Sequence, residues 1–253
     1  MNNITIIIPI HEYDKNIESL LQKAYDSIPN GFKTIMSCSK TAASGVKKQF
    51  NGNENVTVMS NDVTSFVGLV GKAVDKVETK YFSILEFDDT YTDIWFKNVS
   101  EYIKFNPSVS VFMPLTDLYN FNTNKFIGYG NEAVWASSFS DEIGFLDNES
   151  LENFYDFYVT GSVFNTEDWK ELGGLKESFT FAFWYEFLLR ATHFEKKVMV
   201  IPKIGYRHNL DRKGSLLNQY SESSDDASTA KWIEIAKKEQ IYKEDRDLKK
   251  IKS

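Results

Sequence analysis

Two patterns of hydrophobic and polar residues alternate along the first half of the chain. Ile4–Ile10 is an apolar run without polar alternation, which is typical of a strand covered on both faces. Residues 17–28 then carry apolar side chains at the spacing of an amphipathic helix, and Phe32–Met36 is expected to form a second strand. A strand, a helix and a strand in this order predict a parallel sheet whose connection crosses over it.

The pattern continues through the rest of the chain with one interruption. Residues 116–158 are rich in Asn, Asp, Ser and aromatic residues and have no clean period. An acidic, serine-rich linker at 219–228 and a lysine-rich helix at Trp232–Lys250 close the chain. Further strands are expected at Val56–Met59, Tyr81–Leu85, Val109–Leu115, Val159–Phe164 and Val198–Pro202, and further helices at Phe66–Val77, Asp93–Phe105, Asn165–Leu172 and Phe181–Phe194. The predicted fold is α/β, with a mostly parallel central sheet flanked by helices and a C-terminal helical tail.

Composition narrows the class of protein. The 253 residues carry a net charge of −7, which argues against a surface that coats nucleic acid. The single cysteine, Cys38, excludes an intramolecular disulfide and fits a reducing compartment. The first apolar run is too short to cross a membrane and has no basic leader. We therefore expect a cytoplasmic protein without a membrane span, of undetermined oligomeric state.

Acidic residues close the strand expected at Tyr81–Leu85. Glu86, Asp88 and Asp89 follow it directly, and unpaired carboxylates do not enter a core. The carboxyl ends of strands in an open α/β sheet are where ligands bind. Neighbouring carboxylates repel one another, and a hard cation such as Mg²⁺ or Mn²⁺ relieves that repulsion. The alternative interpretation is a solvated acidic turn.

Four segments of residues 4–216 together resemble the large family-two group of inverting glycosyltransferases, which have the GT-A fold that binds nucleotide sugars. The first is the opening strand with Pro9, His11 and Glu12, and the second is the acidic strand end with Glu86 in its first acidic place. The others are Thr160–Phe164 with Leu172-Gly173-Gly174-Leu175-Lys176-Glu177, and Ile201-Pro202 with Tyr206-Arg207-His208 and Gly214-Ser215.

The resemblance implies transfer of a sugar from a nucleoside diphosphate donor, with a UDP-sugar as the first guess, to an acceptor hydroxyl with inversion. It implies a Mn²⁺ or Mg²⁺ ion held by Asp88, with Glu86 and His208 as further ligands. Trp184 and Asp89 would lie on the acceptor side. Residues 1–218 would form the GT-A domain, with a donor half at about 1–115 and an acceptor half at 116–218, followed by the tail at 219–253. The implied donor-binding residues are Pro9, His11, Glu12, Ser37, Glu86, Asp88 and Arg207.

Two departures from the family pattern leave alternatives open. The segment 37–41 has no carboxylate to read the donor base, so the nucleotide stays undetermined. Phe183 and Trp184 occupy the place of the acid pair that supplies the catalytic base. Glu186 is then the candidate base, and a simple ion pair with Arg190 four residues later is the equal alternative.

These departures define the competing functions. The leading hypothesis is a metal-dependent glycosyltransferase acting on a glycan, a protein side chain or a hydroxylated DNA base. The alternative is a non-catalytic module that binds nucleotide sugars or glycans on the same scaffold. A sugar-phosphate nucleotidyltransferase is disfavoured, because residues 11–14 do not form a glycine-rich, basic phosphate loop.

Overall fold

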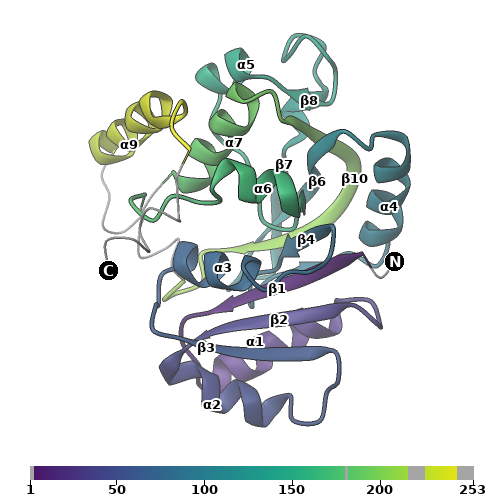
Figure 1. The fold of residues 1–253 in the computed structure, drawn as a ribbon, viewed down its shortest axis with the longest axis vertical. Helices are drawn as coiled ribbons and strands as arrows, with labels where there is room; N and C mark the ends of the chain where they lie inside the picture. The colour runs from purple at the N-terminus through teal and green to yellow at the C-terminus, as the bar shows by residue number, and fades with distance from the viewer. Residues whose placement is uncertain (1–2, 180–181, 216–225, 244–253) are drawn as a thin grey trace.

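Strand β1 (Ile4–Ile10) lies inside a parallel group of strands in this computed structural model, which describes residues 3–179, 182–215 and 226–243. It pairs with β2 (Lys33–Ser39) on one side and β4 (Tyr81–Ile84) on the other, and β3 (Val56–Asn61) pairs with β2 (Figure 1). Every residue of β1 is buried, as its unbroken apolar run predicts.

The remaining strands extend the sheet in the order β3-β2-β1-β4-β9-β6-β10-β5. Strand β9 runs antiparallel to β4 and to β6, whereas β6 and β10 are parallel to each other. The part of the sheet beyond β4 therefore contains both parallel and antiparallel strand pairs. Its strands are β5 (Thr90–Tyr91), β6 (Val109–Asn120), β7 (Lys125–Gly130), β8 (Phe145–Leu146), β9 (Val163–Asn165) and β10 (Lys197–Leu210).

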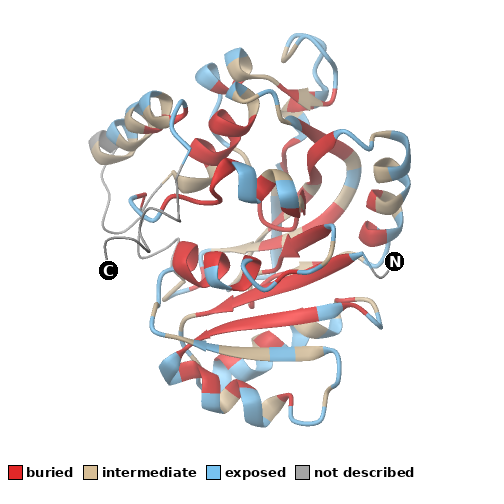
Figure 2. Ribbon diagram, in the orientation of Figure 1, coloured by how far each residue is buried: buried red, intermediate tan, exposed pale blue. Residues whose placement is uncertain are grey.

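Helices cover both faces of the sheet (Figure 1). Successive strand side chains point to opposite faces, so Ile7 joins one core with α3 and α7, while Ile6 and Ile8 join the other with α1, α2 and α4. Figure 2 shows the central strands buried between the two layers. The helices are α1 (Lys15–Asp26), α2 (Lys40–Gln49), α3 (Phe66–Val74), α4 (Trp95–Phe105), α5 (Asn148–Asn153), α6 (Thr166–Leu172), α7 (Phe183–His193), α9 (Asp226–Glu239) and the 3₁₀ turn η1 (Glu132–Trp135).

Helix α2 and strand β9 differ from the sequence prediction for local reasons. Helix α2 was not expected, because its buried face consists of the small residues Ala42, Ala43 and Val46. Its start is fixed by Ser39, whose hydroxyl accepts a hydrogen bond from the Ala42 N–H. Strand β9 is shorter than the predicted strand at 159–164, because Gly161 has a φ of +81° and turns the backbone just before it.

The C-terminal tail packs on the domain. Helix α9 begins and ends earlier than the helix expected at Trp232–Lys250. Lys176 carries the attachment, because its ammonium donates to the Glu239 carbonyl at 2.6 Å. Most of the linker expected at 219–228 lies outside the described residues.

Candidate active site

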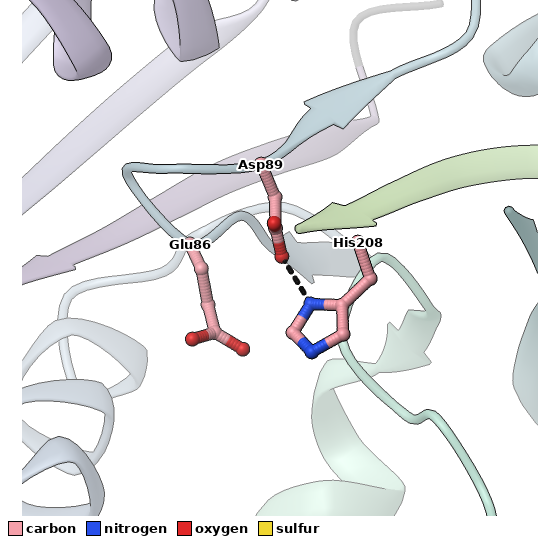
Figure 3. Close-up of side chains that lie close together, drawn as sticks. All are labelled: Glu86, Asp89 and His208. Carbon is pink, nitrogen blue, oxygen red and sulfur yellow. Dashed lines mark hydrogen bonds and ion pairs between the residues drawn. The ribbon is translucent and has the colours of Figure 1, made fainter. Parts of the chain in front are cut away.

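A short antiparallel pairing brings the acidic segment against the end of β10. Strand β5 follows the acids directly, and its register places Arg207 opposite Thr90. His208 consequently lies beside Asp89, with His208 Nδ1 2.6 Å from Asp89 Oδ2 (Figure 3). The Asn209 backbone N–H donates to the other oxygen of Asp89 at 2.8 Å. One carboxylate thus holds together two segments that lie about 120 positions apart in the chain.

Three side chains converge here in a geometry that could hold a metal ion. Glu86, Asp89 and His208 each offer a ligand atom, and these atoms lie within 4.8 Å of one another (Figure 3). The bond from Nδ1 to Asp89 orients the imidazole and leaves Nε2 as the ring nitrogen that can bind a cation. The two carboxylates suit Mn²⁺ or Mg²⁺, and the imidazole can add a nitrogen ligand. The donor set therefore fits the expected ion.

Protons occupy this cluster when no cation neutralises it. Burial and the neighbouring charge of Asp89 raise the pKa of the Glu86 carboxyl to about 8. Burial opposes a charge on His208, but the charge of Asp89 and the hydrogen bond to it raise the pKa of the imidazole to about 9. Both groups are therefore protonated at neutral pH, and an arriving cation must displace those protons.

A tight contact behind the cluster fixes the backbone of Glu86. The Glu86 N–H donates to the Tyr206 hydroxyl at 3.1 Å, and the Gly161 N–H donates to the Ile84 carbonyl at 2.9 Å. A Cβ at Gly161 would lie 2.3 Å from the Tyr206 ring, well inside van der Waals contact. Glycine is needed at this position to let Tyr206 reach Glu86.

Asp88, the first candidate for the metal ligand, lies outside this three-residue group. Arg212 Nε donates to Asp88 Oδ2 at 2.5 Å, and its guanidinium lies 5.0 Å from the centre of the Phe87 ring. Glu12 approaches the same guanidinium at 3.9 Å. Sequence analysis did not single out Arg212. A basic residue four positions after His208 was the available signal.

Arg212 closes a small cavity at the end of β1. The cavity has a volume of about 20 Å³, little more than one water molecule occupies. Ser39 positions the loop on its wall by donating to the His11 carbonyl at 2.8 Å. Burial lowers the pKa of His11 below its ordinary value, against the raising effect of Glu12. The cavity is lined by Pro9, His11, Phe66, Glu86, Phe87, Asp88, Arg212 and Ser215.

A larger cavity of about 360 Å³ adjoins the same cluster. Glu86 and Phe66 line both cavities, so the two cavities meet at the cluster. Trp184 and His208 both lie on the wall of the larger one. Thr229 and Ile233 of α9 complete part of the wall, so the tail contributes to this cavity.

Two of the expected donor-binding residues are engaged elsewhere. Ser37 is fully buried, and its hydroxyl donates to the Leu69 carbonyl at 2.7 Å. The guanidinium of Arg207 lies 3.7 Å from the centre of the Tyr119 ring and donates to Asn124. Neither residue lines the small cavity in the described part of the chain. Arg212 supplies the positive charge there instead.

Glu186 is enclosed by cations. Its carboxylate accepts hydrogen bonds from Arg190 Nε at 2.8 Å and Nη2 at 2.9 Å, and Lys176 Nζ lies 3.0 Å away. The Glu186 side chain is 0% exposed and is absent from the described lining of the large cavity. This geometry favours the ion pair that was the alternative to a catalytic base, and we assign Glu186 to that structural role.

Comparison with known proteins identifies the fold. No family model and no curated protein sequence matches the chain. Among solved structures, it is similar to S. aureus TarS 1-349 in complex with UDP-GlcNAc, with a TM-score of 0.63 and 14% identity over 86% of this chain and 61% of that chain. It is also similar to the mannosyltransferase PcManGT from Pyrobaculum calidifontis in complex with GDP-Man and Mn²⁺, with a TM-score of 0.61 and 12% identity over 94% of this chain and 69% of that chain.

These likenesses confirm the expected GT-A-like α/β fold. The chain spans about three fifths of the length of the TarS chain that it matches. No described helix is long and apolar enough to span a membrane.

Mn²⁺ binding to the donor-free protein should strengthen as the pH rises from about 7 to about 9. Glu86 and His208 must each lose a proton before they bind the ion, so the association constant should rise by up to about tenfold per pH unit for each proton released. Titration calorimetry across this range measures the slope. His208→Asn should reduce it, and His193→Asn, a change at an exposed histidine, should leave it intact. A flat pH profile in the parent protein would contradict this assignment.

Glu186→Gln should lower the free energy of unfolding by about 3–5 kcal/mol, because it leaves the buried guanidinium of Arg190 without its counter-charge. Urea unfolding followed by circular dichroism measures the change. Glu234→Gln, at an exposed acid of α9, serves as the matched control and should have little effect. A catalytic role for Glu186 instead predicts normal stability with lost turnover.

Proposed function

We propose that this protein is a glycosyltransferase that uses a divalent cation to move a sugar from a nucleoside diphosphate donor to an acceptor hydroxyl, with inversion at the anomeric carbon. The observation that carries the proposal is the convergence of Glu86, Asp89 and His208, since Glu86 lines both cavities and His208 lines the larger one. A two-substrate transfer needs a donor and an acceptor to approach one point from different sides.

The small cavity is the proposed donor side. A bound Mn²⁺ or Mg²⁺ would be held by Glu86, Asp89 and His208 and would neutralise charge on the leaving diphosphate. Pro9 and His11 line the same space and suit the nucleoside. A UDP-sugar remains the first guess for the donor.

Arg212 and Asp88 act together in this proposal. The cavity that both residues line has a volume of about 20 Å³, too small for a nucleotide, so donor entry would require Arg212 to move. Arginine forms strong, two-pronged hydrogen bonds with phosphate oxygens. Arg212 would leave the Asp88 carboxylate and bind the diphosphate. Asp88 would then be available to contact the sugar, the ribose or the cation.

The large cavity is the proposed binding site of the acceptor. Helix α9 contributes to this acceptor side together with the segment 116–218. Aromatic rings such as Trp184 and Tyr158 suit the C–H face of a sugar or a planar base. The described lining residues include no lysine or arginine, which disfavours an acceptor rich in phosphate, such as nucleic acid.

A specific observation favours a second candidate, a non-catalytic module that binds nucleotide sugars. Phe183 and Trp184 cannot accept a proton, and Glu186 is bound by Arg190 and Lys176. Donor binding without release of nucleoside diphosphate would select this module over the enzyme.

Titration calorimetry with UDP-GlcNAc, UDP-glucose and GDP-mannose tests the donor side. At least one of these should bind in a manner that requires Mn²⁺ and disappears with a chelator. Asp89→Asn removes a charge from the cluster and should abolish this binding, whereas Asp93→Asn, at an exposed position four residues on, should not. Absence of binding by all three donors, or binding indifferent to Mn²⁺ and to Asp89→Asn, would contradict the proposal.

A further inference from the structure

An attacking acceptor hydroxyl must lose its proton to a base within reach. Among the described residues lining the large cavity, the carboxylates are Glu86 and Asp156. Glu86 lies in the cation-binding group with Asp89 and His208. A carboxylate whose lone pairs face a cation is a poor proton acceptor. Asp156 is therefore the acid in the described lining of this cavity that has no part in the proposed donor site.

The described residues at the start of α7 supply no carboxylate to this cavity. Phe183 and Trp184 line it, and neither ring can accept a proton. Glu186 lies in the same helix but is turned into the cluster of Arg190 and Lys176. The carboxylate must come from another wall, and Asp156, in the segment between α5 and β9, is the residue that provides one.

The backbone presents Asp156 on a fixed turn. The Phe157 N–H donates to the Tyr155 carbonyl at 3.1 Å, so Asp156 is the central residue of a three-residue turn. Asn131 holds the next residues in place. Its side chain accepts from the Tyr158 N–H at 3.0 Å and donates to the Tyr158 carbonyl at 2.8 Å.

The same turn reaches the cation-binding group. The Tyr158 ring centre lies 5.7 Å from that of His208, so the residue two positions after Asp156 packs on a member of the group. Asp156 itself is exposed, which leaves its carboxylate accessible to an acceptor that enters the cavity. A fixed backbone with an accessible carboxylate is the arrangement that positioned proton transfer needs.

We propose that Asp156 is the catalytic base of the transfer, an inference that rests on the proposed function. The acceptor O–H bond breaks and its proton passes to an Asp156 carboxylate oxygen. The acceptor oxygen forms a bond to the anomeric carbon as the bond from that carbon to the diphosphate breaks. The bonding electron pair leaves with the diphosphate. Water in place of the acceptor follows the same steps and yields the free sugar.

Asp156→Asn tests this role, because it keeps the shape of the side chain and removes its ability to take a proton. The assay measures release of nucleoside diphosphate with Mn²⁺ and water as acceptor, using whichever of UDP-GlcNAc, UDP-glucose and GDP-mannose binds most tightly. The rate should fall by about 100-fold or more, with an unchanged donor dissociation constant. Glu149→Gln, an exposed acid of α5 outside the described lining of this cavity, should retain the parent rate.

A second variant separates lost chemistry from a disturbed fold. Asp156→Ala opens space beside the acceptor, and added formate should restore part of the lost rate by taking the proton. The parent protein should gain nothing from formate. Partial rescue requires a folded protein with an intact donor site, so it supports the role of Asp156 as the base.

The outcomes distinguish the two proposals. Failure of the parent protein to bind any of the three donors overturns the proposed function. Donor binding with no release of diphosphate by the parent protein overturns the assignment of Asp156 as a base. Equal rates for the parent protein and Asp156→Asn, or a weakened donor affinity in this variant with an unchanged maximal rate, also overturn it.

Discussion

The candidate site depends on the contact between the Asp89 carboxylate and the end of β10. One oxygen binds His208 Nδ1 and the other binds the Asn209 N–H, so a single side chain closes the sheet around the acidic segment. Without this contact, the turn at 85–89 would present its acids separately to solvent. With it, Glu86 and His208 both line the large cavity and lie within ligand-binding reach of each other.

Repulsion among the acidic residues after β4 explains the ion pairs that surround them. Three acids within four residues repel one another in a buried place, and the protein offsets that repulsion with its own cations. His208 partners Asp89, and Arg212 partners Asp88. A divalent ion and a diphosphate would take over these roles, since the ion competes with the protons of the cluster and the diphosphate competes with Asp88 for Arg212. Under the proposed function, ligand binding would be an exchange of counter-ions.

The sequence predicted the fold better than the site. The apolar run of β1 and the helical period of α1 predicted the parallel half of the sheet. A strand that is buried on both faces consists mostly of apolar residues, which can be recognised in the sequence. Helix α2 was not predicted, because the alanines on its buried face give only a weak hydrophobic pattern. The partnership of Asp89 with His208 could not be predicted, because it depends on the register between β5 and β10, two strands far apart in the chain. Arg212 was missed for a related reason: nothing in the local sequence shows that the loop after β10 returns to Asp88.

The central claim is that the three converging side chains bind the cation that holds the donor. A crystal grown with Mn²⁺ and UDP-GlcNAc, measured at the manganese absorption edge, tests it most directly through the anomalous difference map. The account predicts one strong peak within about 2.3 Å of ligand atoms from Glu86, Asp89 and His208, with the donor diphosphate beside it. Donor density without a peak at this place, or a manganese peak elsewhere in the cleft, would contradict the account.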